Sequence, residues 1–306
     1  MKRVKTLIFA GIIAFAASAQ QPTSTNYQIT SGSLNYYPAF QSQYVEARNV
    51  VVWLPSNYSP SVKHDVIYMH DGQMLFDAAT TWNHQEWQVD EVMGSLTENG
   101  EIRPTIVVGI DNTSNRLGDY FPQKMLKYLP ESQRNLIPSG IALKADAYLQ
   151  FVVNELKPFI DSHYSTYAGP EHTFMLGSSM GGLISLYAIC EYPNVFGGVA
   201  CMSTHVSMNM ATEETPTFNN ELWAQAFRKY LSAHIPKANS RLIYMDRGTV
   251  ELDGTYAPYQ DAVNTLFFSK GWDTAHFSSH VFIGHLHRET FWAERLAIPL
   301  KFLLGR

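Results

Sequence analysis

The chain has 306 residues, 45% of them hydrophobic, which is enough to bury one large core. No long polar or Pro/Gly-rich linker divides it, so we expect a single mature domain. The net charge of -5 and the pI of about 6.1 leave no basic footprint, which argues against nucleic acid as a partner.

The first 19 residues have the pattern of a secretory signal peptide. Residues 2–5 carry three basic side chains, residues 7–17 are apolar, and a small-x-small cleavage pattern occupies residues 17–19. The apolar stretch is short for a bilayer span, and no cysteine follows it for lipid attachment. The sequence therefore predicts a secreted or periplasmic protein of residues 20–306, with no membrane association after the signal is removed.

Three stretches near the start of the mature chain predict strands. Residues 44–55 are rich in β-branched side chains and predict a strand antiparallel to one near residues 34–40. Residues 65–70 predict a strongly apolar strand that ends in a glycine turn. The two polar residues at this turn, His70 and Asp71, are interpreted as structural.

A long segment of mixed character follows. Residues 86–96 predict a helix, and residues 105–110 predict a continuous apolar strand, typical of the centre of a parallel sheet. Residues 112–140 are irregular and carry many basic and aromatic side chains. We expect this segment to form a wall of the substrate cleft, with Arg116 and Tyr120 as contacts; a solvated surface loop is the alternative.

A nucleophile elbow occupies the middle of the chain. After a helical pattern over residues 141–163, an apolar strand ends in the pentapeptide Gly177-Ser178-Ser179-Met180-Gly181, and a helix-competent segment follows at once. A G-x-S-x-G pattern between strand and helix indicates Ser179 as the nucleophile, in a strained turn that needs its glycines. The amide of Met180 faces the expected oxyanion, and the amide of Gln73, in the earlier glycine turn, is the second candidate donor.

The segment after the elbow helix contains a further strand and an insertion. Residues 197–203 predict a central strand, and residues 207–240 predict a partly helical insertion that can form a small cap, with Trp223 as a possible substrate contact. Cys190 and Cys201 lie on the elbow helix and this strand. They either form a disulfide or remain buried free thiols.

The C-terminal third supplies an acid and a base. Two carboxylates, Glu251 and Asp253, follow a predicted strand, and we choose Asp253. Two histidines, His285 and His287, compete as the base. The resulting order of serine, acid and histidine is that of an α/β-hydrolase triad. The elements expected here are a strand at 241–246, a helix at 257–270, a strand at 276–283 and a helix at 289–304.

A His-x-His pair can also bind a metal. No complementary cluster of acids or cysteines is evident in the sequence, so no metal site is predicted.

Four motifs spread over nearly all of the mature chain carry a family resemblance. They are His70-Asp71-Gly72-Gln73-Met74-Leu75-Phe76-Asp77, Val107-Val108-Gly109-Ile110 with Asn112 and Arg116 after it, Gly177-Ser178-Ser179-Met180-Gly181-Gly182, and His287-Arg288-Glu289-Thr290-Phe291-Trp292-Ala293-Glu294-Arg295-Leu296. With them the chain resembles the putative esterase family, which includes esterase D, feruloyl and acetyl xylan esterases, and enterobactin esterases.

The resemblance implies an α/β-hydrolase fold, with a mixed, mostly parallel central sheet and helices on both faces. The closing motif resembles the family pattern of histidine, x, glutamate, two residues and tryptophan, which favours His287 over His285 as the base. The acid region varies in this family, so the resemblance adds nothing to the choice of Asp253.

Together these features predict a serine carboxylic-ester hydrolase that forms an acyl-enzyme intermediate. His287 would take the proton of Ser179, and Asp253 would hold the imidazole. No metal or organic cofactor is required. Export and the aromatic-rich loops favour an acyl group on a carbohydrate, of the feruloyl or acetyl type, as the substrate.

Three alternatives stay open. The basic side chains Arg116, Lys124, Lys127 and Arg134 would instead suit an anionic siderophore lactone of the enterobactin type. An acyltransferase would use the same residues, and a binding protein without activity can share the fold. The sequence leaves the oligomeric state open.

Overall fold

The computed structural model describes residues 20–138, 140–210, 215 and 217–305. The predicted signal peptide, residues 1–19, lies outside these residues. Within the described ranges, no helix combines the length and the apolar character that crossing a bilayer requires.

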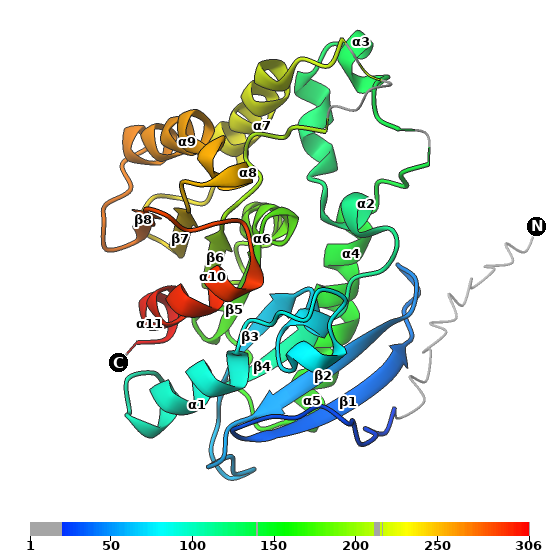
Figure 1. The fold of residues 1–306 in the computed structure, drawn as a ribbon, viewed down its shortest axis with the longest axis vertical. Coiled ribbons are helices and arrows are strands. Elements are labelled where there is room, and N and C mark those ends of the chain that lie inside the picture. Colours follow the sequence, from blue (N-terminus) through cyan, green and yellow to red (C-terminus); the bar gives the residue numbers. More distant parts are fainter. Residues whose placement is uncertain (1–19, 139, 211–214, 216, 306) are drawn as a thin grey trace, which may run out of the picture.

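The described residues form one sheet of eight strands in the order β1-β2-β4-β3-β5-β6-β7-β8 (Figure 1). Strand β2 is antiparallel to β1 and β4, and every other neighbouring pair is parallel. The strands are β1 Ser33–Phe40, β2 Arg48–Leu54, β3 Asp65–His70, β4 Thr105–Ile110, β5 Thr173–Ser178, β6 Gly198–Met202, β7 Leu242–Arg247 and β8 Phe277–Val281. The predicted mixed, mostly parallel sheet is confirmed.

Helices cover both faces of the sheet (Figure 1). The α-helices are α1 Val89–Glu98, α2 Arg116–Tyr120, α3 Glu131–Arg134, α4 Ala145–Phe151, α5 Lys157–His163, α6 Met180–Glu191, α7 Asn220–His234, α8 Glu251–Gly254, α9 Ala257–Ser269, α10 Glu289–Arg295 and α11 Ala297–Leu304. Short 3-10 turns are η1 Gly72–Met74, η2 Ala78–Thr80, η3 Gln123–Tyr128 and η5 Pro170–His172, and η4 Val152–Leu156 is a π-helical turn. The predicted helices on both faces are therefore confirmed.

Side-chain alternation along the strands divides the interior into two cores. On β2, Val50 and Val52 enter the core beneath α4 to α7 and α9, whereas Val51 and Trp53 enter the core beneath α1, α10 and α11. Both sets of side chains are buried, which explains why the central strands read as continuous apolar runs.

Two segments differ from the sequence-based expectation, and prolines mark where their helical elements begin or divide. Residues 112–140 are not irregular but contain α2, η3 and α3, with Pro122 and Pro130 immediately before η3 and α3. The closing helix divides into α10 and α11 at Leu296, since Pro299 lacks the N–H that would bond to the carbonyl of Arg295.

The connection from β5 to α6 depends on the small size of two glycines. A Cβ atom added to Gly177 would lie 2.7 Å from the carbonyl carbon of Gly181 and 2.8 Å from its oxygen. A Cβ atom added to Gly181 would lie 3.2 Å from the Cβ of His70, at the end of β3. The strand and the helix can therefore approach closely only when these positions are glycine.

We expect Gly177→Ala to lower the free energy of unfolding by about 1–3 kcal/mol, because its methyl group meets backbone atoms that cannot move aside independently. Chemical unfolding of the purified variant measures this. Gly140→Ala is the matched control, since a Cβ atom there meets nothing within 4 Å. Equal stability of the two variants would contradict the close approach.

Candidate active site

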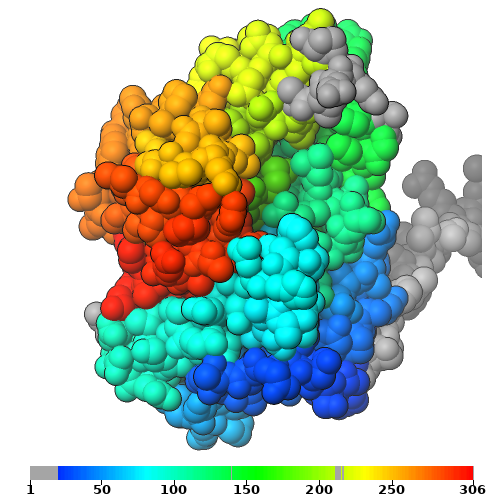
Figure 2. Space-filling model, viewed as in Figure 1, coloured from blue at the N-terminus to red at the C-terminus, as the bar shows by residue number. Residues whose placement is uncertain are grey.

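A cleft of about 520 Å³ opens at the carboxyl ends of the parallel strands. In Figure 2 the surface is hollowed where its cyan, green and orange-red parts meet, so segments distant in sequence form the walls. The residues that line the cleft are Asp71, Gln73, Met74, Trp82, Asn83, Gln85, Trp87, Asn112, Arg116, Ser178, Ser179, His287, Arg288, Glu289 and Trp292.

Ser179 lies between β5 and α6 in a strained conformation, with φ 55° and ψ -119°. Its N–H donates to the carbonyl of Met202 on β6, at 2.9 Å, which ties the turn to the neighbouring strand. The candidate nucleophile is thus exposed to the cleft at a point where the backbone is held from two elements.

The two candidate oxyanion donors lie in the first turns of separate helical elements. Met180 is the first residue of α6, so its N–H has no carbonyl partner within the helix. Gln73 lies in η1 and lines the cleft, and its Oε1 accepts the backbone N–H of Asn112 at 3.1 Å. This bond holds η1 against the end of β4.

His287 and Asp253 meet although 34 residues separate them. His287 Nδ1 lies 2.6 Å from Asp253 Oδ1, and the Asp253 side chain is fully buried while that of His287 is 15% exposed. The imidazole ring is therefore held through Nδ1, and its Nε2 is left for the cleft. The structure therefore places a serine and a histidine in one cleft, with a buried carboxylate bonded to the histidine.

The environment of Asp253 favours its charged form. Burial alone would raise the pKa of this carboxyl group, but hydrogen bonds from His287, Ser203 and Gly248 hold the pKa below its usual value. Oδ2 accepts the Ser203 hydroxyl at 2.5 Å and the Gly248 N–H at 2.6 Å. A carboxylate with all of its oxygens bonded to donors remains ionised at neutral pH.

The competing acid and base have other partners. Glu251 is half-exposed and forms an ion pair with Arg288, at 2.9 Å. His285 Nδ1 lies 3.3 Å from Nη1 of the buried Arg295, and its ring packs against Phe291 with centroids 5.0 Å apart. Neither Glu251 nor His285 lines the cleft.

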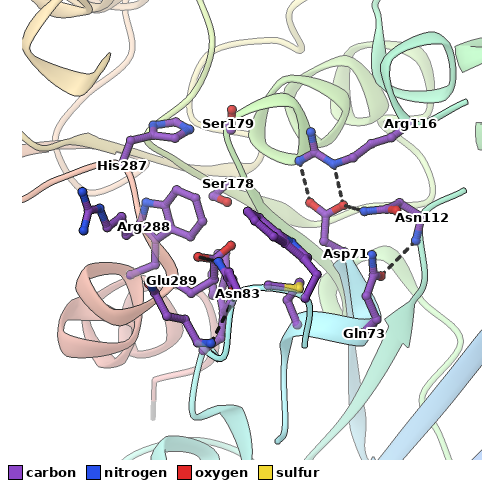
Figure 3. A pocket seen from close by; sticks show the side chains of 15 residues that line it. Asp71, Gln73, Asn83, Asn112, Arg116, Ser178, Ser179, His287, Arg288 and Glu289 are labelled. Carbon is purple, nitrogen blue, oxygen red and sulfur yellow. Dashed lines mark hydrogen bonds and ion pairs between the residues drawn. The ribbon is translucent and has the colours of Figure 1, made fainter. Parts of the chain in front are cut away.

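An ion pair forms the wall of the cleft opposite His287 (Figure 3). Arg116 binds Asp71 with both Nε and Nη2, at 2.7 Å each, and Asn112 donates to the same carboxylate at 2.6 Å. The pKa of Asp71 is lowered, because Arg116 outweighs the effect of burial. Asp71 thus fixes its own turn, in agreement with the structural interpretation.

His70 is also structural in its contacts. It is buried, and its Nδ1 lies 2.8 Å from the hydroxyl of Tyr148 on α4. Burial lowers the pKa of His70 to about 3, so its imidazole is neutral at physiological pH. A Cβ atom added to Gly181 would lie 3.2 Å from the Cβ of His70, so His70 lies close to the elbow.

The predicted substrate contacts have different surroundings. Arg116 lines the cleft, but its guanidinium is bound to Asp71 and stacks over the ring of Tyr120 at 5.2 Å. Tyr120 is fully buried behind this pair. Trp223 is fully buried on α7, where Nε1 donates to Gln133 at 3.1 Å. The expectation that Trp223 contacts substrate is wrong, because core packing covers its indole.

The described part of the 207–240 insertion contains α7, which packs against η3, α6 and α9. Its described residues do not line the cleft around Ser179. Instead, the Asn219 N–H and the Trp223 Nε1 both donate to Gln133 Oε1, which connects α7 to α3.

The other basic residues of the 112–140 segment do not converge on the cleft. Lys124 pairs with Glu191 and lies 3.8 Å from Asp146, and Lys127 Nζ lies 3.2 Å from Nε2 of His234. Glu191 and His234 are the last residues of α6 and α7, and neither lines the cleft. The predicted anion-attracting cluster is therefore dispersed.

Several residues of the site were missed in the sequence. Trp82 is 82% exposed at the cleft. Trp87 and Trp292 also line the cleft but are nearly buried, and their ring centroids lie 5.3 Å apart. The aromatic density directly after the glycine turn could have indicated Trp82 and Trp87. Ser203 follows the strand next to that of Ser179. Because the carboxyl ends of parallel strands lie at the same edge of a sheet, this position could have indicated Ser203.

The cysteines and the carboxylates elsewhere offer little chemistry to the cleft. Cys190 and Cys201 are buried free thiols, so no disulfide joins them, and burial raises the pKa of both. Within the described part of the chain, one group of three side chains could share a metal ion, and it lies at the start of α1 rather than in the cleft: Glu86, Asp90 and Glu91.

Comparison with known proteins identifies relatives among uncharacterized bacterial proteins. YjcH of Bacillus subtilis (strain 168) is 30% identical over 180 residues, which are 59% of this chain and 65% of YjcH. YbbA of the same organism is 28% identical over 157 residues, 51% of this chain and 56% of YbbA. The chain thus spans less than two thirds of the length of either relative.

Solved structures share the fold at low sequence identity. A ferulic acid esterase superposes with a TM-score of 0.65 at 18% identity, covering 90% of this chain and 99% of that one. The BES protein of Bacillus cereus gives 0.66 at 16% identity, with 93% and 99% covered. The enterobactin esterase FES of Shigella flexneri gives 0.63 at 17% identity, with 92% and 60% covered.

The family model described as Putative esterase matches residues 42–297, which include the glycine turn, the elbow and the closing histidine motif. Since this match covers most of the chain, the protein belongs to the Putative esterase family.

Proposed function

We propose that the protein is a serine carboxylic-ester hydrolase. The observation that carries this proposal is the shared cleft of Ser179 and His287, together with the 2.6 Å contact between His287 Nδ1 and Asp253 Oδ1. Family membership supports the same reaction class.

In the proposed reaction, His287 Nε2 takes the proton of the Ser179 hydroxyl as Oγ attacks the ester carbonyl. The imidazolium that forms is stabilised by Asp253. The N–H groups of Met180 and Gln73 bind the oxyanion, and His287 then protonates the departing alcohol. Water, activated by the same imidazole, releases the acid from the acyl-enzyme.

We infer that the substrate carries its acyl group on a carbohydrate, of the feruloyl or acetyl type. The indole of Trp82 is 82% exposed at the cleft and offers a flat apolar surface of the kind that binds aryl groups and sugar rings, whereas Trp87 and Trp292 also line the cleft but are nearly buried. Both guanidinium groups of the cleft, Arg116 and Arg288, are already bound to carboxylates. The cleft therefore presents little free positive charge to an anionic ligand.

The siderophore alternative rests on the solved enterobactin esterases, which share the fold. Their likeness is no greater than that of the ferulic acid esterase, and the paired arginines disfavour a catecholate. We further infer export, from the charge and apolar pattern of residues 1–19.

The proposal is tested by comparing kcat/KM for methyl ferulate, p-nitrophenyl acetate and enterobactin. We expect turnover of methyl ferulate to exceed that of enterobactin. The reverse order would select the siderophore class. Acyl transfer to an added alcohol in excess of hydrolysis would select an acyltransferase. Absence of turnover together with no covalent labelling of Ser179 by a fluorophosphonate would contradict the enzyme and favour a binding protein.

Trp82 offers a prediction about substrate binding. We expect Trp82→Ala to raise KM for methyl ferulate by about 5- to 20-fold with little change in kcat, because a rim contact is similar in ground and transition states. Phe268→Ala is the control, since Phe268 is 48% exposed on α9 and outside the cleft. An unchanged KM in Trp82→Ala would remove the indole from the binding surface.

A further inference from the structure

Ser203 connects the candidate triad acid to a buried arginine. It follows β6 directly, and its hydroxyl donates to Asp253 Oδ2 at 2.5 Å. The Oγ atom of Ser203 also lies 2.7 Å from Arg295 Nη2 and 3.0 Å from Trp292 Nε1. Ser203, Asp253 and Arg295 are each at most 2% exposed, so water does not compete for these bonds.

The direction of every bond in this group follows from chemistry. The guanidinium and the indole N–H are donors only, so both oxygen lone pairs of Ser203 accept, from Arg295 and Trp292. The single hydroxyl proton is therefore directed to Asp253. With the Gly248 N–H it fills Oδ2, which leaves Oδ1 to His287.

The backbone of Ser203 is held as firmly as its side chain. Its φ of 40° is unfavourable for a residue with a Cβ atom. Its N–H donates to Asp246 Oδ1 at 3.0 Å, and Asp246 also binds Nε and Nη2 of Arg295 at 3.2 and 3.0 Å. Strained backbone is concentrated at functional sites, so the strain at Ser203, which bonds to the candidate acid, indicates a functional role in addition to packing.

We propose that Ser203 is a positioning residue of the ester hydrolase. Its hydroxyl accepts a hydrogen bond from Arg295 and thereby orients the Asp253 carboxylate toward His287. The inference rests on the proposed function. Arg295 Nη2 lies 3.9 Å from Asp253 Oδ2, too far for a direct hydrogen bond, so the hydroxyl of Ser203 transmits the influence of the guanidinium. The other titratable groups that face Asp253 are His287 and Tyr256.

Two variants separate the hydroxyl from the backbone. Ser203→Ala removes the hydroxyl and keeps the strained φ, whereas Ser203→Gly removes the hydroxyl and tolerates that φ. We expect both to lower kcat by about 10- to 100-fold with KM little changed, the range for a lost hydrogen bond to a charged group. Thr105→Val is the control, because it removes a buried hydroxyl at the opposite end of the parallel strands.

The pH profile distinguishes positioning from a structural role. The Ser203 bond lowers the pKa of Asp253, so its loss should raise that pKa. Because the acid limb of kcat/KM reports the coupled His287–Asp253 pair, we expect this limb to move to higher pH. The same change appears in stability. The ionised carboxylate stabilises the fold above its unfolded pKa and this is lost as pH falls through the folded pKa, so the variants should lose melting temperature at a higher pH than wild type.

A double-mutant cycle with Asp253→Asn completes the test. If Ser203 acts through Asp253, Ser203→Ala should change kcat by less than about 2-fold in the Asp253→Asn background. A full additional loss there, unmoved pH profiles, or a loss in Ser203→Ala that Ser203→Gly restores would overturn the proposal. Wild type and Ser179→Ala are assayed alongside. If these two are equally active, the proposed function fails instead, and the stability profiles alone still test the Ser203–Asp253 bond.

Discussion

Ser179→Ala is expected to lower kcat for ester hydrolysis by about 10⁶-fold, the loss seen when the nucleophile of such a triad is removed. Alanine keeps the turn and the two amides at Met180 and Gln73, so only the attacking oxygen disappears. Substrate binding should persist, with KM little changed. Steady-state turnover of p-nitrophenyl acetate measures kcat and KM, and Ser179→Ala should also fail to react with a fluorophosphonate.

The matched control for this variant is Ser185→Ala, on the same helix. Ser185 is fully buried, and its hydroxyl donates to the carbonyl of Gly181 at 2.8 Å, which the helix itself does not require. We expect its kcat to stay within a few-fold of wild type. If Ser179→Ala retained more than a small fraction of the activity while remaining folded, another group would have to be the nucleophile.

Asp253→Asn should produce the second-largest effect, a loss in kcat of about 10⁴-fold. The surroundings determine how the asparagine would sit. Ser203 and Gly248 both donate to the Oδ2 position, so the amide oxygen must occupy it and the NH₂ group must face His287. Nδ1 would then accept a hydrogen bond, which leaves the ring proton on Nε2, where it blocks attack by Ser179.

The control for Asp253→Asn is Glu251→Gln, two residues earlier on α8. Glu251 is half-exposed and pairs with Arg288, and an exposed pair contributes little. We expect its kcat to be nearly unchanged. Equal losses in the two variants, measured with the same ester at neutral pH, would remove the distinction between the two carboxylates and the basis for assigning the acid.

Local patterns in the sequence determined the framework of this protein. The bounds of β3 and β4 were predicted correctly, because a buried parallel strand must be apolar on both faces. The elbow was also evident, since a strand that turns directly into a helix needs glycine at positions 177 and 181. Both constraints act within a few consecutive residues, so they can be recognised from the local sequence.

The tertiary structure alone decided which polar groups meet. Asp253 and Glu251 are two residues apart, and only the packing of α8 turns one carboxylate inward to His287 and the other outward to Arg288. Trp223 is of a residue type that often contacts substrates, yet its indole is fully buried on the inner face of α7. Such choices depend on partners far away in the chain, and residue type does not specify them.

The network behind the acid shows the same limit most clearly. Ser203 follows β6, whereas Asp246, Asp253 and Arg295 lie on β7, α8 and α10, and no spacing in the sequence relates the four. They meet because the parallel order of β6 and β7 brings two strand ends together beneath α10. The sequence by itself determined the strands and indicated the candidate nucleophile, whereas the three-dimensional register of those strands determined what surrounds the candidate acid, since hydrogen bonds act only over about 3 Å.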